Sequence, residues 1–349
     1  MSHLLVTRFS ALGDVAMTIP VIYSFARQYP DIEITFLTRK NLEHMFCNAP
    51  ANIHFKGVNL DNYKGLRGMK RLYKELKAES YDYVADLHDV LRTQYLRFRF
   101  SLSGVPTAHI DKGRKEKKQL TRKRNKILKP LDSSFVRYKK VLEKLGFQFD
   151  LGFKSIYSEQ QPDESVFSHL TGEKGKEKWL AVAPFAKHKG KIYPLDLQEQ
   201  VIGALSKKEN LRIFLFGGGK SEKQIVSEWK EKYPEITSVI GKLNMEQELA
   251  LLSCMDLALS MDSANMHLSS LVNIPVFSVW GATHPYAGFM GWNQPEDNAI
   301  QTDLECRPCS VFGNKPCYRG DYACMYDIQP KSIVEKITAF LELNQTNSF

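Results

Sequence analysis

Apolar and polar positions along the first half of the chain alternate between strand-like and helix-like patterns. Short apolar runs at 3–8, 32–37 and 81–87 have the length and composition of buried strands. Between them, apolar residues recur at helical spacing over 14–28 and 63–77, and a further helix is expected from about residue 89. Strand, helix and strand in this order predict a parallel sheet with right-handed crossovers.

The second half of the chain repeats the same pattern. Strands are expected at 179–184, 211–216, 236–240, 256–261 and 274–280, with helices over 195–207, 221–232, 245–253 and 263–272. A helix over 135–145 and a charged stretch with Gly and Pro over 150–176 separate the two halves. We therefore expect two α/β domains, at 1–160 and 177–329, followed by a C-terminal helix over 330–349. Ligands of such sheets bind beyond the carboxyl ends of the strands.

The composition is that of a soluble globular protein large enough for two cores. The chain has 349 residues, of which 43% are hydrophobic and 25% are charged. No apolar run reaches the ~18 residues that a membrane-spanning helix needs. The N-terminus lacks the basic start, apolar middle and small-residue cleavage site of an export signal, so the expected location is the cytoplasm.

Positive charge is concentrated in one segment. The formal net charge is +9, and residues 112–126 carry nine Lys or Arg against one Glu. This basic segment is either a solvated loop or an electrostatic binding site for an anionic partner: a phospholipid surface, a phosphorylated glycan or a nucleic acid.

Four of the six cysteines lie close together in the sequence. Cys306, Cys309, Cys317 and Cys324 fall within a Cys-rich segment at 303–327. In a cytoplasmic chain such a cluster points to metal binding more than to disulfides. The first pair has a usual spacing for zinc ligands and the second pair does not, so a structural zinc site and free thiols both remain open.

Four loops at the predicted carboxyl ends of strands carry the candidate chemistry. In the first, Ser10 to Gly13 lead into Asp14 at the start of a helix, where unpaired N–H groups attract anions. Asp14 is therefore either a helix cap or a catalytic carboxylate. The second loop, within 182–194, is rich in lysines that suit phosphate oxygens.

The third and fourth loops lie farther along the chain. FLFGGGKSEKQ, at 214–224, has three glycines after a buried strand and matches neither the GxGxxG fingerprint nor the GxxxxGK[ST] phosphate loop. In the fourth, Asp262 and Ser263 end a strand and start a helix that contains His267. Together with the GAT turn at 281–283, they suggest a pocket for a nucleoside diphosphate.

The set of motifs resembles one known family. RFSALGDVAMTIPV, PFAKHKGKIYP, FGGGKSE and DSANMHLSSLVNIPVFSVWGATHP occur in the order seen in glycosyltransferase family 9, the lipopolysaccharide heptosyltransferases. The resemblance implies a GT-B fold: two Rossmann-like, doubly wound domains that face a central cleft. It also implies that the N-terminal half binds the acceptor and the C-terminal half binds the nucleotide sugar.

The resemblance assigns roles to individual residues. It implies that Asp14 is the catalytic base, that Lys191 contacts the diphosphate and that Glu222 contacts the ribose. Asp262 and His267 take the Asp and His positions of the family's D-[ST]-G-x-x-H motif. The expected nucleotide-sugar site also includes Ser10, Gly13, Lys187, Gly217, Gly218, Ser263 and Ala264. The sequence departs from the family pattern at 192–193, where Ile-Tyr replaces [RK]-Trp, and at Ala264, where the family has Gly.

The function expected from the resemblance is metal-independent, inverting transfer of heptose from ADP-heptose to the inner core of lipopolysaccharide. His88, Arg92 and Arg97 are candidate acceptor-binding residues. The basic segment is expected to contact the lipid-anchored anionic glycan and the inner membrane. The helix at 330–349 is expected to pack back on the first domain.

Two alternatives stay open at this point. The first is a family 9 enzyme with another nucleotide sugar or glycan acceptor. The second is a nucleic-acid-binding protein that uses residues 112–126 and a four-cysteine zinc site. The basic segment contains no aromatic residue on which bases could stack, which weakens this second alternative. We therefore do not expect a nucleic acid as a partner.

Overall fold

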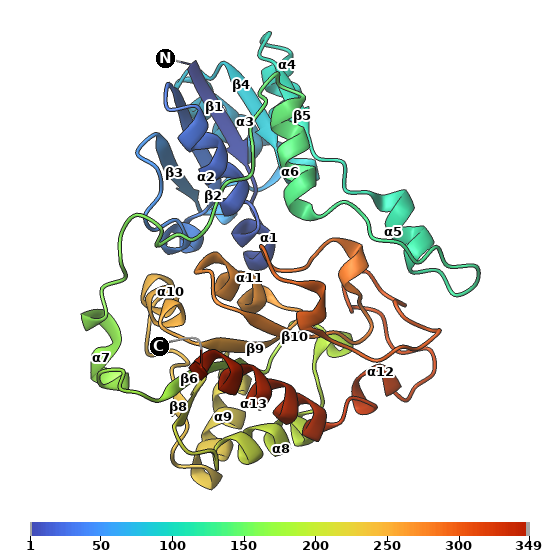
Figure 1. The fold of residues 1–349 in the computed structure, drawn as a ribbon. Helices are drawn as coiled ribbons and strands as arrows, with labels where there is room; N and C mark the ends of the chain where they lie inside the picture. The colour runs from blue at the N-terminus through green and yellow to red at the C-terminus, as the bar shows by residue number, and fades with distance from the viewer. Residues whose placement is uncertain (1, 347–349) are drawn as a thin grey trace. The chain divides into compact units, whose positions relative to one another are not determined.

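The structure is a computed structural model that describes residues 2–346, with side chains described as far as Leu343. The chain divides into two compact units. The first unit comprises Met1–Arg114 and Asp132–Glu159, and the second comprises Lys115–Leu131 and Gln160–Phe349. Each unit is built on one parallel sheet with helices on both faces (Figure 1).

The first unit has a five-stranded sheet with the order β3-β2-β1-β4-β5. The strands are β1 (Ser2–Thr7), β2 (Ile32–Arg39), β3 (Ile53–Val58), β4 (Tyr83–Asp86) and β5 (Thr107–His109). All neighbours are parallel, and β1 is central because Leu4 pairs with Ile34 of β2 on one side and Tyr83 of β4 on the other. This is the order of a doubly wound sheet.

Helices cover both faces of this sheet. They are α1 (Leu12–Ala16), α2 (Ile19–Gln28), α3 (Gly65–Lys77), α4 (Leu91–Ser101) and α6 (Ser134–Glu143). The inner sides of α3 and α4 form one core cluster with β1, β2 and β4, through residues such as Leu72 and Leu96. The right-handed crossovers from β1 to β2 and from β3 to β4 run in opposite directions across the sheet. The helix α2 therefore lies on the face opposite to α3 and α4, where it contacts α6.

The second unit has a six-stranded parallel sheet with the order β11-β10-β9-β6-β7-β8. Its strands are β6 (Lys178–Ala183), β7 (Leu211–Leu215), β8 (Thr237–Ser238), β9 (Leu257–Met261), β10 (Val276–Val279) and β11 (Ala299–Ile300). Its helices are α5 (Arg114–Leu120), α7 (Ser165–Thr171), α8 (Leu195–Leu205), α9 (Lys220–Lys232), α10 (Met245–Ser253), α11 (Ala264–Leu271), α12 (Ala323–Tyr326) and α13 (Pro330–Thr346). Buried side chains of α8, α9 and α13 share one core cluster on one face of the sheet.

The two predicted parallel α/β sheets are confirmed, with differences in detail. Three strands, β3, β5 and β11, were not predicted. β5 and β11 have only three and two residues, too few for a readable pattern, and β3 (IHFKGV) has few apolar residues. The helix expected over 14–28 is two helices. The hydroxyl of Thr18 donates to the carbonyl of Val15 at 2.7 Å, and Pro20, which has no N–H, lies in the first turn of α2.

Two segments pack differently from the expectation. The C-terminal helix α13 packs along α8 and places Ile333, Ile337 and Leu341 in the core of the second unit, whereas the sequence suggested the first domain. Residues 347–349 of that predicted segment lie outside the described part of the chain. Residues 115–131, placed by the sequence within the domain 1–160, belong to the second unit. No helix among the described residues is both long and apolar enough to cross a membrane.

Candidate functional site

Both sheets have a topological switch point, and the candidate residues lie beside these points. In the first unit the strand order reverses between β1 and β4, and in the second unit it reverses between β6 and β9. Loops that leave the carboxyl ends of such strands diverge and leave room for a ligand. Ser10 and His88 follow β1 and β4, and Lys191 and Asp262 follow β6 and β9.

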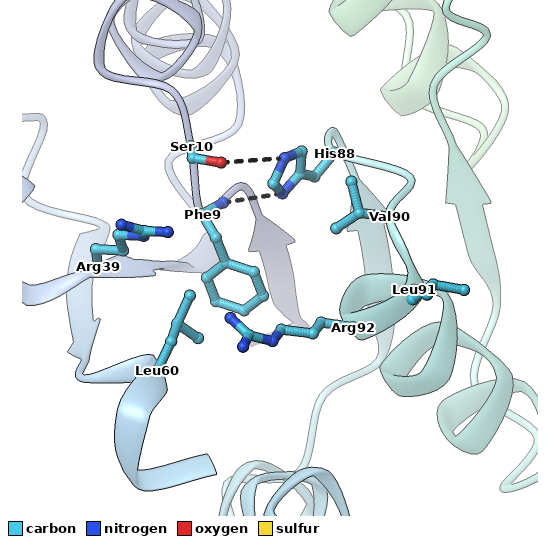
Figure 2. A pocket seen from close by; sticks show the side chains of 8 residues that line it. All are labelled: Phe9, Ser10, Arg39, Leu60, His88, Val90, Leu91 and Arg92. Atoms are coloured by element: carbon cyan, nitrogen blue, oxygen red, sulfur yellow. Dashed lines mark hydrogen bonds between the residues drawn. The ribbon is translucent and has the colours of Figure 1, made fainter. Parts of the chain in front are cut away.

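A depression of about 350 Å³ lies at the switch point of the first unit. Figure 2 shows the guanidinium groups of Arg39 and Arg92 turned toward the same space beside the apolar side chains of Phe9 and Leu60. The complete lining is Phe9, Ser10, Arg39, Leu60, His88, Val90, Leu91 and Arg92. A pocket with two cations and an apolar floor suits an anionic sugar, since the ring can contact apolar side chains and the charge can pair with arginine.

His88 is neutral at physiological pH in this pocket. Burial, followed by the nearby cations Arg8 and Lys112, lowers the pKa of His88 to about 4. Its Nδ1 accepts the backbone N–H of Phe9 at 3.3 Å, so the single proton of the neutral ring is on Nε2. That Nε2 lies 3.5 Å from the hydroxyl oxygen of Ser10, to which it donates (Figure 2). His88 therefore orients Ser10 and presents no charge to the pocket.

Asp14 lies on α1, and its carboxylate is held by an arginine. Oδ1 lies 3.1 Å from Nη2 of Arg8, whose side chain is 8% exposed, while the Asp14 side chain is 32% exposed. Asp14 is the third residue of α1, and its Oδ2 accepts the backbone N–H of the N-cap residue Ala11 at 3.1 Å. Both interpretations from the sequence are compatible with this geometry, because the carboxylate caps the first turn and still has an exposed edge.

The third candidate acceptor residue, Arg97, lies outside this pocket. Its Nη1 is 3.1 Å from Oδ2 of Asp86, which is fully buried, and 3.6 Å from Oδ1 of Asp89. Arg97 therefore neutralises a buried carboxylate at the end of β4. The structure thus places Arg97 outside the pocket that His88 and Arg92 line, and its role in acceptor binding stays a prediction.

In the second unit, a lysine and an aspartate pair across the switch point. Nζ of Lys191 lies 2.9 Å from Oδ2 of Asp262, and the exposed fractions of the two side chains are 16% and 2%. The hydroxyl of Thr283, at the end of β10, donates to the same Oδ2 at 2.7 Å. Asp262 is thus enclosed and fixes the ammonium group of Lys191 at the carboxyl edge of the sheet.

The glycine-rich loop after β7 is closed by Glu222. Oε2 of Glu222, in the first turn of α9, accepts the backbone N–H of Gly218 at 2.7 Å. A Cβ atom on Gly217 would lie 2.9 Å from this same oxygen, so a larger residue there would push the Glu222 carboxylate from its place. Gly219 has φ +145°, a backbone conformation that side chains other than glycine rarely adopt. The loop is therefore built tightly around the carboxylate that was predicted to bind ribose.

The helix that follows β9 offers backbone N–H groups at its start. Ser263 is the N-cap of α11 and makes no capping hydrogen bond with its side chain; its hydroxyl lies 3.4 Å from that of Ser260. The first-turn N–H groups from Ala264 onward are therefore available to an anion. His267, in the middle of α11, is 6% exposed, so its side chain mainly packs against the protein interior. Lys187 is exposed in the loop after β6.

The aromatic residue that departs from the family pattern lies in the core. Tyr193 is 1% exposed, and its hydroxyl donates to the carbonyl of Ile328 at 2.6 Å. Its backbone N–H donates to the sulfur of Met261 at 3.3 Å. Tyr193 therefore anchors the loop after β6 to the segment before α13, and its replacement of tryptophan changes core packing.

The Cys-rich segment is anchored by an arginine. Cys306, Cys309, Cys317 and Cys324 are free thiols. In the part of the chain that the structure describes, no three His, Cys, Asp or Glu side chains are arranged to hold a metal ion, so the predicted zinc site is not formed. Burial raises the pKa of the Cys324 thiol to about 12.

Arg307 supplies the anchor. Its side chain donates to the carbonyl oxygens of Gly281 at 2.5 Å and of Trp280 and Thr283 at 3.0 Å each. It also donates to the carbonyl of Thr302 and to Oε1 of Gln301. These bonds tie the Cys-rich segment to the end of β10, beside the Lys191–Asp262 pair.

The structure thus gathers the predicted residues in two groups, one in each unit. Ser10, His88 and Arg92 share the pocket of the first unit, with Gly13 and Asp14 on the adjoining α1. The other predicted nucleotide-sugar residues lie along the carboxyl edge of the second sheet. Arg8 and Arg39 were not predicted from the sequence, and Thr283 was singled out only as part of the GAT turn. Arg8 directly follows β1 and Arg39 is the last residue of β2. Their position at the carboxyl ends of predicted strands could have identified them as candidates.

Known proteins resemble this chain over most of its length. Residues 69–317 match the family "Glycosyltransferase family 9 (heptosyltransferase)". Lipopolysaccharide heptosyltransferase 3 of Escherichia coli K12 is 25% identical over 303 residues, which cover 83% of this chain and 84% of that protein. Lipooligosaccharide heptosyltransferase 2 of Campylobacter jejuni is 26% identical over 138 residues, a match that spans 38% of this chain and only 42% of that relative.

A solved structure shares the fold. The structure described as E. coli heptosyltransferase WaaC with ADP superposes with a TM-score of 0.66 at 16% identity and covers 97% of this chain and 99% of that one. The likeness at this identity supports the architecture: two Rossmann-like parallel sheets, as expected for the GT-B class.

Proposed function

The chain belongs to glycosyltransferase family 9, and from this premise we propose that it transfers a heptosyl residue from ADP-heptose to an anionic sugar of the lipopolysaccharide inner core, with inversion at the anomeric carbon. The observation that carries the proposal is the Lys191–Asp262 pair beside the start of α11, at the switch point of the second sheet. An ammonium group and unpaired helix N–H groups in one place form a binding site for a diphosphate. ADP is also the nucleotide in the WaaC structure described above.

The second unit supplies the donor site in this proposal. Lys191 and the first N–H groups of α11 stabilise the negative charge that develops on the departing ADP. Asp262 positions Lys191, because its side chain is 2% exposed and its Oδ2 is bonded to both Lys191 and Thr283. Glu222 keeps one carboxylate oxygen on the glycine-rich loop and presents the other to the ribose hydroxyls.

The first unit supplies the base and the acceptor site. Asp14 accepts the proton of the attacking acceptor hydroxyl, and the oxygen of that hydroxyl forms the new bond to the anomeric carbon as the bond to ADP breaks. Arg8 holds the carboxylate in a fixed orientation at 3.1 Å. Arg39 and Arg92 bind the anionic group of the acceptor in the pocket of Figure 2, and Ser10, oriented by His88, donates to one of its hydroxyls.

One alternative keeps the reaction and changes the sugar. Its support is Ala264, which puts a methyl group at the first residue of α11, where the family has glycine. The departure at Tyr193 gives no such support, because that side chain is buried away from the sheet edge. The nucleic-acid-binding alternative has no support from the comparisons. Two of the basic side chains that it requires, Lys117 and Lys123, instead lie over the rings of Phe289 and Tyr318.

We place the enzyme in the cytoplasm, in peripheral contact with the inner membrane that holds its acceptor. The exposed cations of the basic segment, such as Lys115, Lys118 and Arg124, give it electrostatic attraction to anionic lipids. Structural zinc at the four cysteines is not part of the proposal, because the described geometry does not assemble a ligand set.

A panel of nucleotide sugars tests the proposal. The full chain is incubated with ADP-heptose and with UDP-, GDP- and CMP-sugars, and its thermal stability is measured before transfer to a purified core acceptor is assayed. ADP-heptose should give the largest rise in melting temperature and the transfer product. If only another nucleotide sugar raises the melting temperature, that sugar is the donor. If none raises it, the proposed donor site is wrong.

A further inference from the structure

The helix α4 has two apolar faces, of which only one is covered. Leu96 and Phe100 point into the core of the first unit. Leu91, Phe98 and the C-cap residue Leu102 are instead 86%, 59% and 68% exposed. Their spacing of seven and four residues places them on one side of the helix. Single exposed apolar residues are common on proteins, but an aligned stripe of large ones marks an interaction surface.

The neighbouring helix α3 extends this surface. Leu66, in the first turn of α3, is 75% exposed. It lies seven residues before Tyr73, whose ring is 4.5 Å from the guanidinium carbon of Arg99 on α4, so Leu66 is on the side of α3 that faces α4. The two helices contact each other over the same face of the sheet. We call the outer side of α3 and α4 the α3–α4 face.

This face is strongly basic as well as apolar. The two helices carry one acid, Glu75, against eight basic residues: Arg67, Lys70, Arg71, Lys74, Lys77, Arg92, Arg97 and Arg99. Glu75 lies 3.8 Å from Arg71, and Arg97 alone among the cations turns inward to the buried Asp86. Arg92 lines the pocket of Figure 2, and Arg99 lies over the rings of Tyr73 and Tyr95. The five basic residues of α3 are all exposed, next to four exposed apolar side chains of the two helices.

We propose that the α3–α4 face docks on an anionic membrane surface, with Leu66, Phe98 and Leu102 entering the boundary between headgroups and acyl chains. Arginine and lysine beside exposed leucine and phenylalanine are the pattern of helices that lie in a membrane interface, where the cations meet lipid phosphates. The long basic side chains reach the headgroups while their stems stay against the apolar residues. Charge excludes a second copy of this chain as the partner, because a two-fold contact would place one basic face against another.

The location of the stripe agrees with a lipid-linked acceptor, a point that rests on the function proposed above. Leu91 is the first residue of α4 and also lines the pocket that holds Arg39 and Arg92. From there the stripe runs along α4 for about 16 Å, at 1.5 Å per residue. A membrane that covers the stripe would lie at the rim of the pocket, so an acceptor sugar could enter it while its lipid stays in the bilayer.

The test replaces the two apolar residues that lie away from the pocket. Binding of the full chain to vesicles of phosphatidylcholine with about one third phosphatidylglycerol is measured by co-sedimentation. The double variant Phe98→Ser/Leu102→Ser should bind at least about tenfold more weakly than the unchanged protein, at an unchanged melting temperature. Leu343→Ser is the matched control, because Leu343 is 67% exposed on α13 and Leu102 is 68% exposed; it should bind as the unchanged protein does.

A second arm separates this face from the basic segment. Lys70→Gln/Lys74→Gln on α3 should weaken vesicle binding by about fivefold per residue at low salt. Lys115→Gln/Lys118→Gln makes the same change of charge in the basic segment. If only this second pair weakens binding, or if Phe98→Ser/Leu102→Ser binds vesicles normally, the proposal is wrong. If that variant instead abolishes a dimer in solution, a second copy covers the face. Vesicle binding without sugar transfer would overturn the proposed reaction and leave the docking face intact.

Discussion

Replacing Lys191 with methionine separates the structural and the ligand-binding roles of this residue. Lys191 and Asp262 are 16% and 2% exposed, and their charged atoms lie 2.9 Å apart. Removing one partner of such a buried pair leaves an uncompensated charge, which costs about 3–5 kcal/mol. The hydroxyl of Thr283 still donates to Asp262 at 2.7 Å, so we expect the lower end, ~3 kcal/mol. For a unit of this size that corresponds to a fall in melting temperature of about 6–12 °C.

The double variant Lys191→Met/Asp262→Asn removes both charges. An asparagine can keep the hydrogen bond with Thr283 and has no charge to compensate, so most of the lost stability should return. ADP binding should not return. A hydrogen bond from a cation to a phosphate contributes about 1.5–3 kcal/mol, so both variants should bind ADP about 10- to 100-fold more weakly than the unchanged protein.

Thermal unfolding and calorimetric titration with ADP measure the two effects. Lys189→Met is the matched control: this lysine is exposed, two residues away, and lies over the ring of Tyr322 at 4.8 Å. It should change neither quantity appreciably. If ADP affinity recovers in the double variant together with stability, Lys191 only supports the fold. If Lys191→Met unfolds at the original temperature, the buried pair does not stabilise this unit.

Three further predictions concern other parts of the molecule. Asp14→Asn should lower turnover by about 10²- to 10⁴-fold and leave calorimetric ADP-heptose affinity intact, and normal turnover would remove Asp14 as the base. The pKa of His88 is about 4 in the folded chain against ~6.5 unfolded, so the unfolded state takes up the proton first as pH falls. Stability from neutral His88 is therefore full above pH ~6.5 and lost toward pH ~4, by about 1–2 kcal/mol after allowance for solvent screening. His88→Asn should abolish this part of the pH dependence in urea unfolding, and an unchanged slope would contradict it. Arg307→Ala leaves five oxygen acceptors near the end of β10 without their donor and should lower stability by ~3 kcal/mol or more. An unchanged melting temperature would show that the Cys-rich segment is held in another way.

The sequence by itself determined the class of fold and most of the loops that carry chemistry. Alternating strand and helix patterns predicted two parallel sheets, and both are present. Glycines at 217–219 and the acid at 222 marked a tight turn, because a residue without a Cβ is needed where the backbone must approach a side chain. These features are local: periodicity, turn chemistry and motif spacing are all contained within a few residues.

Only the tertiary structure decided which residues meet. Lys191 and Asp262 are far apart in the sequence and pair because β6 and β9 are neighbours in the sheet. Asp14 pairs with Arg8, and Arg97 pairs with the buried carboxylate of Asp86. A hydrophobic pattern states that a segment is buried but not what buries it, so the packing of α13 on α8 could not be read from it. The sequence also does not say which apolar residues stay exposed. Three large apolar residues on α4 and at its C-cap are left uncovered, and only the fold shows this.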